Sequence, residues 1–228
     1  MSAPLPRGDD KRHAVRRLFD TISPRYDLVN RVMTLGMDVG WRRTAVASLR
    51  LPGRALVADL ACGTGDLCRE LRRRGYRAVG FDFSHGMLVN SRTDAPLVEA
   101  DILQLPLADA AIEGATCGFA LRNVVSLGGF FRELGRVVRP GGRVALLDAS
   151  EPDGRLLRAG HGVYFNHVVP LIGGTISNRA AYAYLPRSMA YLPSPGEMVS
   201  MLRDAGFPDA DRRQLSGGLT QLLVGTRG

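Results

Sequence analysis

Short apolar runs alternate with helix-like stretches from about residue 55 to the end of the chain. The apolar runs have the length of buried strands, and apolar positions between them recur at a helical period. This alternation is typical of a mostly parallel β-sheet that helices cover on both faces. We therefore expect a doubly wound α/β fold whose strands cover residues 55–61, 78–83, 97–100, 115–121, 144–149 and 219–225.

Two of the intervening stretches are clearly amphipathic. Residues 66–74 place Leu67 and Leu71 on one face and a run of arginines on the other, and a glycine follows as a stop signal. Residues 126–138 repeat the pattern, and the Arg-Pro-Gly-Gly turn at 139–142 then leads into another strand.

The charge and the cysteines narrow the function classes. A formal net charge of +8 predicts attraction to anionic surfaces, but the arginines are spread over all segments rather than clustered with aromatic residues. We therefore expect no nucleic-acid partner. Three cysteines and four histidines lack metal-ligand spacing, so neither a metal site nor a disulfide framework is expected. No apolar run reaches the roughly 20 residues of a membrane span, which predicts a cytoplasmic protein.

The strongest chemical signal is the turn Asp-Leu-Ala-Cys-Gly-Thr-Gly-Asp at residues 59–66. It lies directly between an expected strand and an expected helix, where Gly63 and Gly65 let backbone N–H groups approach a ligand closely. No Lys-Ser or Lys-Thr follows the glycines, so the turn is not a phosphate-binding P-loop.

Two acidic residues follow at the ends of the next two expected strands. Asp82 stands 17 positions after Gly65, where a carboxylate can accept hydrogen bonds from both hydroxyls of a ribose. Asp101 can accept from an adenine amino group while Ile102 packs on the ring. The third glycine of a dinucleotide fingerprint is replaced by Cys68, which favours a smaller nucleoside over a dinucleotide.

Several longer segments carry a family resemblance. The chain resembles class I S-adenosylmethionine-dependent methyltransferases with a Rossmann-like fold, and among them the menaquinone and ubiquinone C-methyltransferase family (UbiE/MenG). The resemblance implies S-adenosylmethionine as cofactor, S-adenosylhomocysteine as its product, and no metal. The segments that carry it are Phe19-Asp20, Tyr26-Asp27-Leu28-Val29-Asn30, Trp41-Arg42-Arg43, Leu121-Arg122-Asn123-Val124, Arg139-Pro140-Gly141-Gly142, the Tyr-rich run at 181–188 and Ser216-Gly217-Gly218.

The resemblance also implies a set of cofactor contacts. Thr64, Asp82, Asp101 and Ile102 match family contacts, and Gly118 stands where the family usually has a serine. Tyr26 begins a segment that closes over the cofactor in the family. The expected cofactor-binding residues are therefore Tyr26, Gly63, Thr64, Gly65, Asp82, Asp101, Ile102 and Gly118.

The implied reaction is C-methylation of a demethylmenaquinol ring to menaquinol. Arg122 and Asn123 follow the fourth strand and are candidates to hold the developing phenolate, although Arg122 also suits a structural ion pair. Asp148 ends the fifth strand and is a candidate base or orienter, with helix capping as the alternative. Tyr182 and Tyr184 are candidates to line the ring pocket, with packing as the alternative.

Other functions stay open. The family pattern is broken at Asp38, Gly118, Asp148 and Leu223, so the acceptor could instead be a ubiquinone precursor or another small cyclic or aromatic metabolite. From other classes, an RNA-binding protein and a non-catalytic cofactor-binding protein are the alternatives. The sequence does not fix the oligomeric state, and a homodimer is one option.

The partner expected for this function is a small lipophilic quinol, which a soluble enzyme must meet at a bilayer surface. Lys11, Arg12, Arg16 and Arg17 flank apolar residues in a short amphipathic stretch, which predicts peripheral contact with an anionic membrane. The alternative is a packed helix whose basic side faces water.

The chain is expected to form one methyltransferase domain. Its parts are an N-terminal helical cover at 1–51, a cofactor-binding core at 52–149, a substrate-cover insertion at 150–195, and a C-terminal helix with strands at 196–228.

Overall fold

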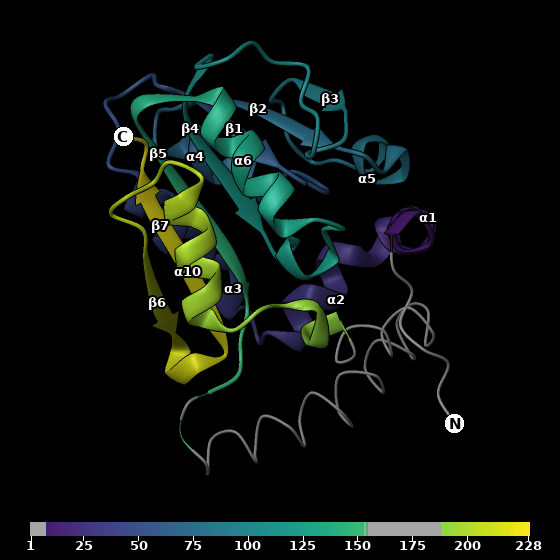
Figure 1. Ribbon diagram of the computed structural model, residues 1–228. Coiled ribbons are helices and arrows are strands. Elements are labelled where there is room, and N and C mark those ends of the chain that lie inside the picture. The colour runs from purple at the N-terminus through teal and green to yellow at the C-terminus, as the bar shows by residue number, and fades with distance from the viewer. Residues whose placement is uncertain (1–7, 153, 155–187) are drawn as a thin grey trace.

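The computed structural model describes residues 8–152, 154 and 188–228, and its centre is a seven-stranded sheet (Figure 1). The strand order is β3-β2-β1-β4-β5-β7-β6, with parallel pairing from β3 to β5 and antiparallel pairing of β7 with β5 and β6. The predicted doubly wound α/β fold is confirmed. The strands are β1 (Leu56–Leu60), β2 (Arg77–Asp82), β3 (Leu97–Glu99), β4 (Ile112–Gly118), β5 (Val138–Ala149), β6 (Asp211–Leu215) and β7 (Thr220–Thr226).

Helices precede the sheet in the chain and connect its strands. The two helices predicted at 66–74 and 126–138 are confirmed to within one residue at each end. The helices are α1 (Gly8–Ile22), α2 (Tyr26–Met33), α3 (Met37–Leu49), α4 (Asp66–Arg73), α5 (His85–Val89), α6 (Leu127–Val137) and α10 (Pro195–Asp204), with 3₁₀ turns η1 (Ser23–Arg25), η2 (Leu121–Asn123), η4 (Met189–Tyr191) and η5 (Ser216–Gly218).

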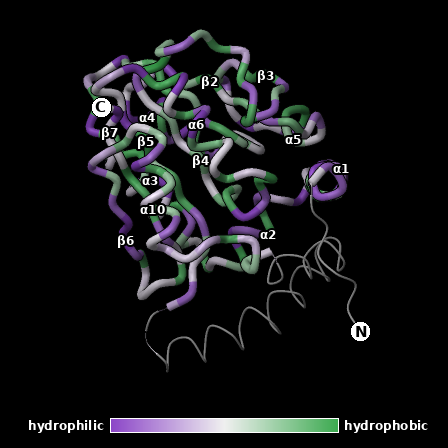
Figure 2. The backbone as a smooth tube through the Cα atoms, in the orientation of Figure 1, coloured by the Kyte–Doolittle hydropathy of each residue, from purple (hydrophilic) through white to green (hydrophobic). Residues whose placement is uncertain are grey.

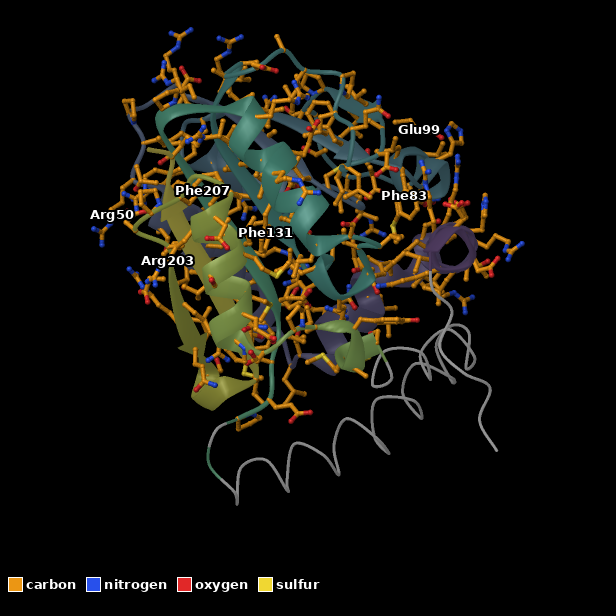
Figure 3. All side chains as sticks on the ribbon, viewed as in Figure 1. Arg50, Phe83, Glu99, Phe131, Arg203 and Phe207 are labelled. Carbon is orange, nitrogen blue, oxygen red and sulfur yellow. The ribbon has the colours of Figure 1, made fainter. Side chains whose placement is uncertain are left out.

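Alternation along β1 explains the two layers. Ala58 and Leu60 face one core, which contains Phe131 of α6, side chains of α10, and Phe207 (Figure 3). Val57 faces the other core, which α3 and α4 close. Because successive strand side chains point to opposite faces, one buried strand needs helices on both sides. Figure 2 shows the hydrophobic segments running through the sheet between these helices.

The structure corrects some element boundaries. The expected strand at 115–121 begins three residues earlier and ends at Gly118, because Phe119 has φ +60° and leaves the extended conformation. The turn at 139–142 lies inside β5, where Gly141 has φ +75° and the register against β4 shifts between Ile112 and Gly114.

Two elements were missed by the sequence patterns. β6 reads Asp-Arg-Arg-Gln-Leu and forms one edge of the sheet, so only one side of it is paired and its polar side chains stay partly exposed (Figure 2). α5 has only five residues, too few to show a helical period, and begins where Ser84 Oγ accepts from the Met87 N–H.

Nothing in the described part of the chain is a helix long and apolar enough to cross a membrane, and no group of three potential metal ligands occurs there. The candidate ring-pocket residues Tyr182 and Tyr184, with most of the expected substrate cover, lie outside the described residues. The proposed division at residues 51, 149 and 195 stays a prediction.

Candidate active site

A cavity lies at the carboxyl ends of the parallel strands, beneath α1. Most of the predicted site residues line this cavity. They are Tyr26, Gly63, Asp82, Asp101, Ile102 and Gly118 of the cofactor set and Asn123 of the catalytic set. From α1 the cavity is lined by Arg12, Val15 and Phe19. Thr64, Gly65, Arg122 and Asp148 do not line it, so any role they have is exerted through neighbours or through backbone atoms.

The glycine turn links β1 to α4 through residues with positive φ. Gly63 has φ +55° and Gly65 has φ +86°, and a Cβ on Gly65 would lie 2.5 Å from Thr93 Cγ2. A side chain at that position would therefore have to displace its neighbour and also adopt a disfavoured backbone conformation. The tight turn leaves Gly63 free to line the cavity with its backbone.

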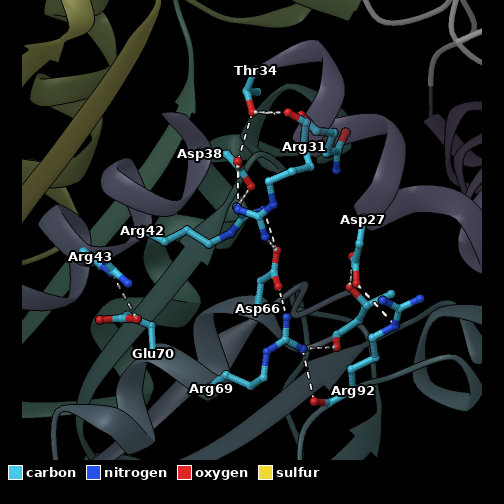
Figure 4. Close-up of polar contacts among 12 residues, drawn as sticks. Asp27, Arg31, Thr34, Asp38, Arg42, Arg43, Asp66, Arg69, Glu70 and Arg92 are labelled. Atoms are coloured by element: carbon cyan, nitrogen blue, oxygen red, sulfur yellow. Dashed lines mark hydrogen bonds and ion pairs between the residues drawn. The ribbon is translucent and has the colours of Figure 1, made fainter. Parts of the chain in front are cut away.

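Thr64 is buried and its hydroxyl donates to the Asp27 carboxylate of α2. Arg92 Nε lies 3.8 Å from the other Asp27 oxygen, as Figure 4 shows. Thr64 therefore ties the glycine turn to the helix that begins at Tyr26.

Asp82 ends β2 and is 5% exposed. Its Oδ2 accepts from the Gly63 N–H at 2.8 Å and its Oδ1 accepts from the Ser84 N–H at 2.9 Å. Burial raises the pKa of this carboxyl to about 6, while the two backbone hydrogen bonds oppose the shift. At neutral pH the carboxylate still predominates and keeps lone pairs for hydroxyl donors in the cavity.

Asp101 follows β3, and its carboxylate contacts both the loop after β3 and the α1 helix. Its Oδ1 accepts from the Leu103 N–H at 2.9 Å, and its Oδ2 lies 2.7 Å from Nη2 of Arg12. Ile102 adds an apolar wall to the cavity beside this carboxylate.

Arg122 and Asp148 form a buried ion pair. The guanidinium donates to Asp148 Oδ1, and the Arg122 N–H donates to Oδ2 at 3.0 Å. The Asp148 carboxylate is 0% exposed and also accepts from the Ala149 N–H at 2.7 Å. This geometry matches the structural ion-pair alternative for Arg122, and it leaves Asp148 screened from the cavity. The pair holds the η2 turn, so that Asn123 lines the cavity.

A second polar network joins the N-terminal helices to α4 (Figure 4). The Asp38 carboxylate pairs with the guanidinium of Arg42, and its Oδ1 lies 2.9 Å from Nη1 of Arg31. Arg42 also lies 3.2 Å from Asp66, the residue directly after the glycine turn. Sequence reasoning missed this role of Arg42, although the Trp-Arg-Arg segment marked its position. Asp38, one of the family departures, is buried at 1% exposure as an acceptor in this network.

The α1 helix packs one side against the body of the protein, while the side chains of Arg12 and Arg16 stay 49% and 45% exposed and Arg17 is exposed. Lys11 and Val15 are buried, Arg12 pairs with Asp101, and Arg16 Nη2 lies 2.6 Å from Glu99 Oε1. The geometry thus matches the packed-helix alternative for most of this stretch.

The site suits an adenine nucleoside. Two carboxylates stand at adjacent strand ends, an apolar wall lies beside them, and a backbone turn with positive φ leaves room for close approach. These are the acceptors that ribose hydroxyls and an adenine amino group require. The residues present therefore fit S-adenosylmethionine.

Comparison with known proteins gives the same result. The demethylmenaquinone methyltransferase of Deinococcus radiodurans is 40% identical over 234 residues, covering 97% of each chain. The ubiquinone/menaquinone biosynthesis C-methyltransferase UbiE of Syntrophotalea carbinolica is 39% identical over 221 residues, covering 93% of each. A solved S-adenosylmethionine-dependent methyltransferase from Thermotoga maritima superposes with a TM-score of 0.66 at 18% identity, covering 93% of this chain and 99% of the other, which supports the fold.

The model of the ubiE/COQ5 methyltransferase family matches residues 7–227, nearly the whole chain. The expected enzyme class and methyl donor are thereby confirmed. This chain belongs to the ubiE/COQ5 family of S-adenosylmethionine-dependent methyltransferases.

Proposed function

We propose that the protein methylates a ring carbon of a demethylmenaquinol, giving menaquinol and S-adenosylhomocysteine. The observation that carries the proposal is one cavity that combines acidic strand ends with an apolar remainder, formed by Val15, Phe19, Val124 and Val125 among others. An apolar pocket with few polar groups suits a planar ring. The names of the relatives from Deinococcus and Syntrophotalea supply the acceptor class.

The cofactor half of the cavity has assigned roles in this proposal. Asp82 accepts from the ribose hydroxyls, Asp101 from the adenine amino group, and Ile102 packs on the adenine. Gly63 and Gly118 contribute backbone, and Tyr26 covers the ligand from α2. Thr64 and Gly65 act by holding the turn in shape.

The sulfonium of S-adenosylmethionine supplies an electrophilic methyl group, so the protein's main task is orientation. Fixing the acceptor carbon in line with the methyl and sulfur atoms can contribute roughly 7 to 11 kcal/mol. The acceptor carbon becomes nucleophilic as a quinol hydroxyl loses its proton. We assign the amide of Asn123 to hold the developing phenolate, since Asn123 lines the cavity.

Arg122 and Asp148 act one step further from the ring in this proposal. Both Asp148 oxygens accept from protein donors, so we assign Asp148 to fix Arg122 rather than to remove a proton. Arg122 in turn fixes the turn that carries Asn123. The proton of the quinol then passes to solvent or to a group other than Asp148.

The test is mass spectrometry of the quinones in cells that lack the protein. Accumulation of ring-demethylated menaquinone is the expected result, and purified protein with deuteromethyl S-adenosylmethionine should add a labelled methyl to a short-tailed demethylmenaquinol. Because one relative is named for both quinones, the same spectra are searched for demethylated ubiquinone precursors. Unchanged menaquinone with such precursors present would transfer the assignment to the ubiquinone branch.

We further propose that the protein meets its acceptor at a bilayer surface, because a polyprenyl tail stays in lipid. On α1, Lys11 is buried and Arg12 and Arg16 are paired with Asp101 and Glu99, which reduces the positive charge that this helix offers for the contact. The large exposed apolar side chains Leu28 and Leu35, 56% and 80% exposed at α2 and its following turn, supply an alternative contact. Sedimentation with anionic and neutral vesicles distinguishes contact through these leucines from contact through the basic residues of α1. The double variant Leu28→Ser with Leu35→Ser should lose vesicle binding, while Arg17→Gln should retain it. The reverse pattern would favour electrostatic docking by α1.

A further inference from the structure

The α1 helix carries a lysine that lies inside the protein. Lys11 is 4% exposed, and its ammonium donates to the carbonyl of Arg122 at 3.0 Å and to the carbonyl of Val124 at 2.8 Å. The same ammonium lies 3.7 Å from the ring centroid of Tyr191 in η4. A buried cation is costly unless it is hydrogen-bonded, and these contacts satisfy it.

The two carbonyls flank Asn123. The turn that carries Asn123 is therefore held from two sides, by Asp148 of the sheet through Arg122 and by Lys11 of α1. The first contact joins parts of the same rigid core. The second joins the core to a helix that covers the cavity, so it exists only while that helix lies in place.

We infer that Lys11 is a positioning residue: it fixes the Asn123 turn at the cavity when α1 closes over it. This inference deepens the proposed function, because it assigns to α1 a part in aligning the acceptor ring. The sequence pattern had placed Lys11 on a membrane-facing surface, and its burial removes it from that role.

The other tethers of α1 lie elsewhere and do not duplicate this contact. Arg12 and Arg16 pair with Asp101 and Glu99 near the end of β3. At the far end of the helix, Asp20 accepts from the Ser84 hydroxyl at 2.6 Å and from the Gly86 N–H at 3.0 Å. Removing the ammonium of Lys11 should thus loosen the acceptor half of the site while the cofactor half keeps its contacts.

The protonation of Lys11 gives a readout specific to this role. Burial lowers the pKa of the ammonium to about 8. The ammonium contacts the carbonyls of Arg122 and Val124 and the Tyr191 ring from η4, while the Arg122 guanidinium is paired with Asp148 of β5. Above pH 8 the amine is neutral and donates more weakly, so the advantage of the wild type over an uncharged variant should shrink.

The main experiment compares Lys11→Met with Arg17→Met, which removes one positive charge from an exposed position of the same helix. We expect Lys11→Met to lower kcat/KM for a short-tailed quinol by roughly ten- to a hundredfold, the range for hydrogen bonds to a charged group. Calorimetry should give a cofactor Kd within about threefold of the wild type, and the ratio of wild-type to Lys11→Met activity should fall from pH 7 to 9.5. Arg17→Met should match the wild type in all three measurements.

Amide hydrogen exchange tests the contact without any acceptor. Faster exchange at residues 121–125 in Lys11→Met supports the inference even if the quinol proves to be the wrong substrate, so failure of the function and of the lysine's role are distinguishable. Tyr191→Leu, which removes the ring face, should show a weaker form of the same pattern, and Tyr191→Phe, which keeps the ring face, should lie closer to the wild type than Tyr191→Leu. These two variants also serve if Lys11→Met fails to fold.

Wild-type kcat/KM in Lys11→Met would overturn the inference, as would loss of cofactor affinity in proportion to activity. A pH-independent activity ratio combined with unchanged exchange at 121–125 would also overturn it.

Discussion

Asp148→Asn offers the sharpest test of how the Asn123 turn is held. The substitution keeps the size of the side chain but removes the charge that neutralises the Arg122 guanidinium, which lies in a residue only 8% exposed. Removing one partner of a buried pair leaves an uncompensated charge and costs about 3 to 5 kcal/mol. Because the free energy of unfolding of such domains is about 5 to 15 kcal/mol, the loss of stability should be large but measurable.

Urea denaturation followed by circular dichroism measures that loss, and the double variant Arg122→Met with Asp148→Asn provides the control. Without the guanidinium no charge is stranded, and the carbonyl of the introduced amide can still accept from one of the two backbone N–H groups that Asp148 serves. We expect the double variant to recover most of the stability. A single variant within 1 kcal/mol of the wild type, or a double variant whose loss equals the sum of the two single losses, would refute the ion-pair reasoning.

Turnover of the double variant then separates two roles for Arg122. If Arg122 acts only by holding the turn, the refolded double variant should keep part of its kcat. If the guanidinium must approach the acceptor's charge during the reaction, the double variant should have the same low kcat as Arg122→Met alone, and its cofactor affinity should be unchanged.

Two further predictions concern buried carboxyls. Burial raises the pKa of Asp59 to about 7, so the folded chain binds this proton more tightly than the unfolded chain. The resulting contribution to stability is fully present below about pH 4 and is lost as the pH rises to about 7. It amounts to at most on the order of 4 kcal/mol. Asp59→Asn, which keeps an acceptor for the Thr116 hydroxyl, should remove this pH dependence, and parallel melting profiles of variant and wild type between pH 4 and 8 would contradict the assignment. Asp82→Asn should weaken S-adenosylmethionine binding by roughly 1.5 to 3 kcal/mol in calorimetry, and wild-type affinity should fall as the pH drops below about 6; unchanged affinity in the folded variant would remove Asp82 from the site.

The central sheet and the glycine turn could be predicted because local sequence determines them. Strands buried on both faces are mainly apolar, as β1 is apart from Asp59, and a strand that meets a helix at Gly63 and Gly65 needs residues that accept positive φ. β6 left no such signal, because an edge strand that is half exposed tolerates Asp, Arg and Gln. The sequence pattern therefore identified the inner strands and the edge strand β3, and missed the polar edge strand β6.

The partners of charged side chains could not be predicted in the same way. Lys11 and Arg17 look equivalent in an amphipathic pattern, but only Lys11 meets two backbone carbonyls that lie 111 and 113 positions away in the chain. Arg122 and Asp148 were found as strand-end residues, and whether they touch the ligand or each other depends on tertiary distances. Charge patterns give the residues that can pair, and the fold selects which ones do.

The position of α1 also has a kinetic consequence. Its Arg12 meets the carboxylate assigned to the adenine, and its Lys11 holds the turn assigned to the quinol ring, so one rigid segment spans the compartments of both ligands. Because α1 covers both ligands, the cofactor and the acceptor should not exchange with solvent independently. A movement of α1 that releases S-adenosylhomocysteine also breaks the Lys11 contacts to the turn assigned to the acceptor ring. We expect the order of arrival and departure to be set by this helix, with its opening rather than methyl transfer limiting the steady-state rate.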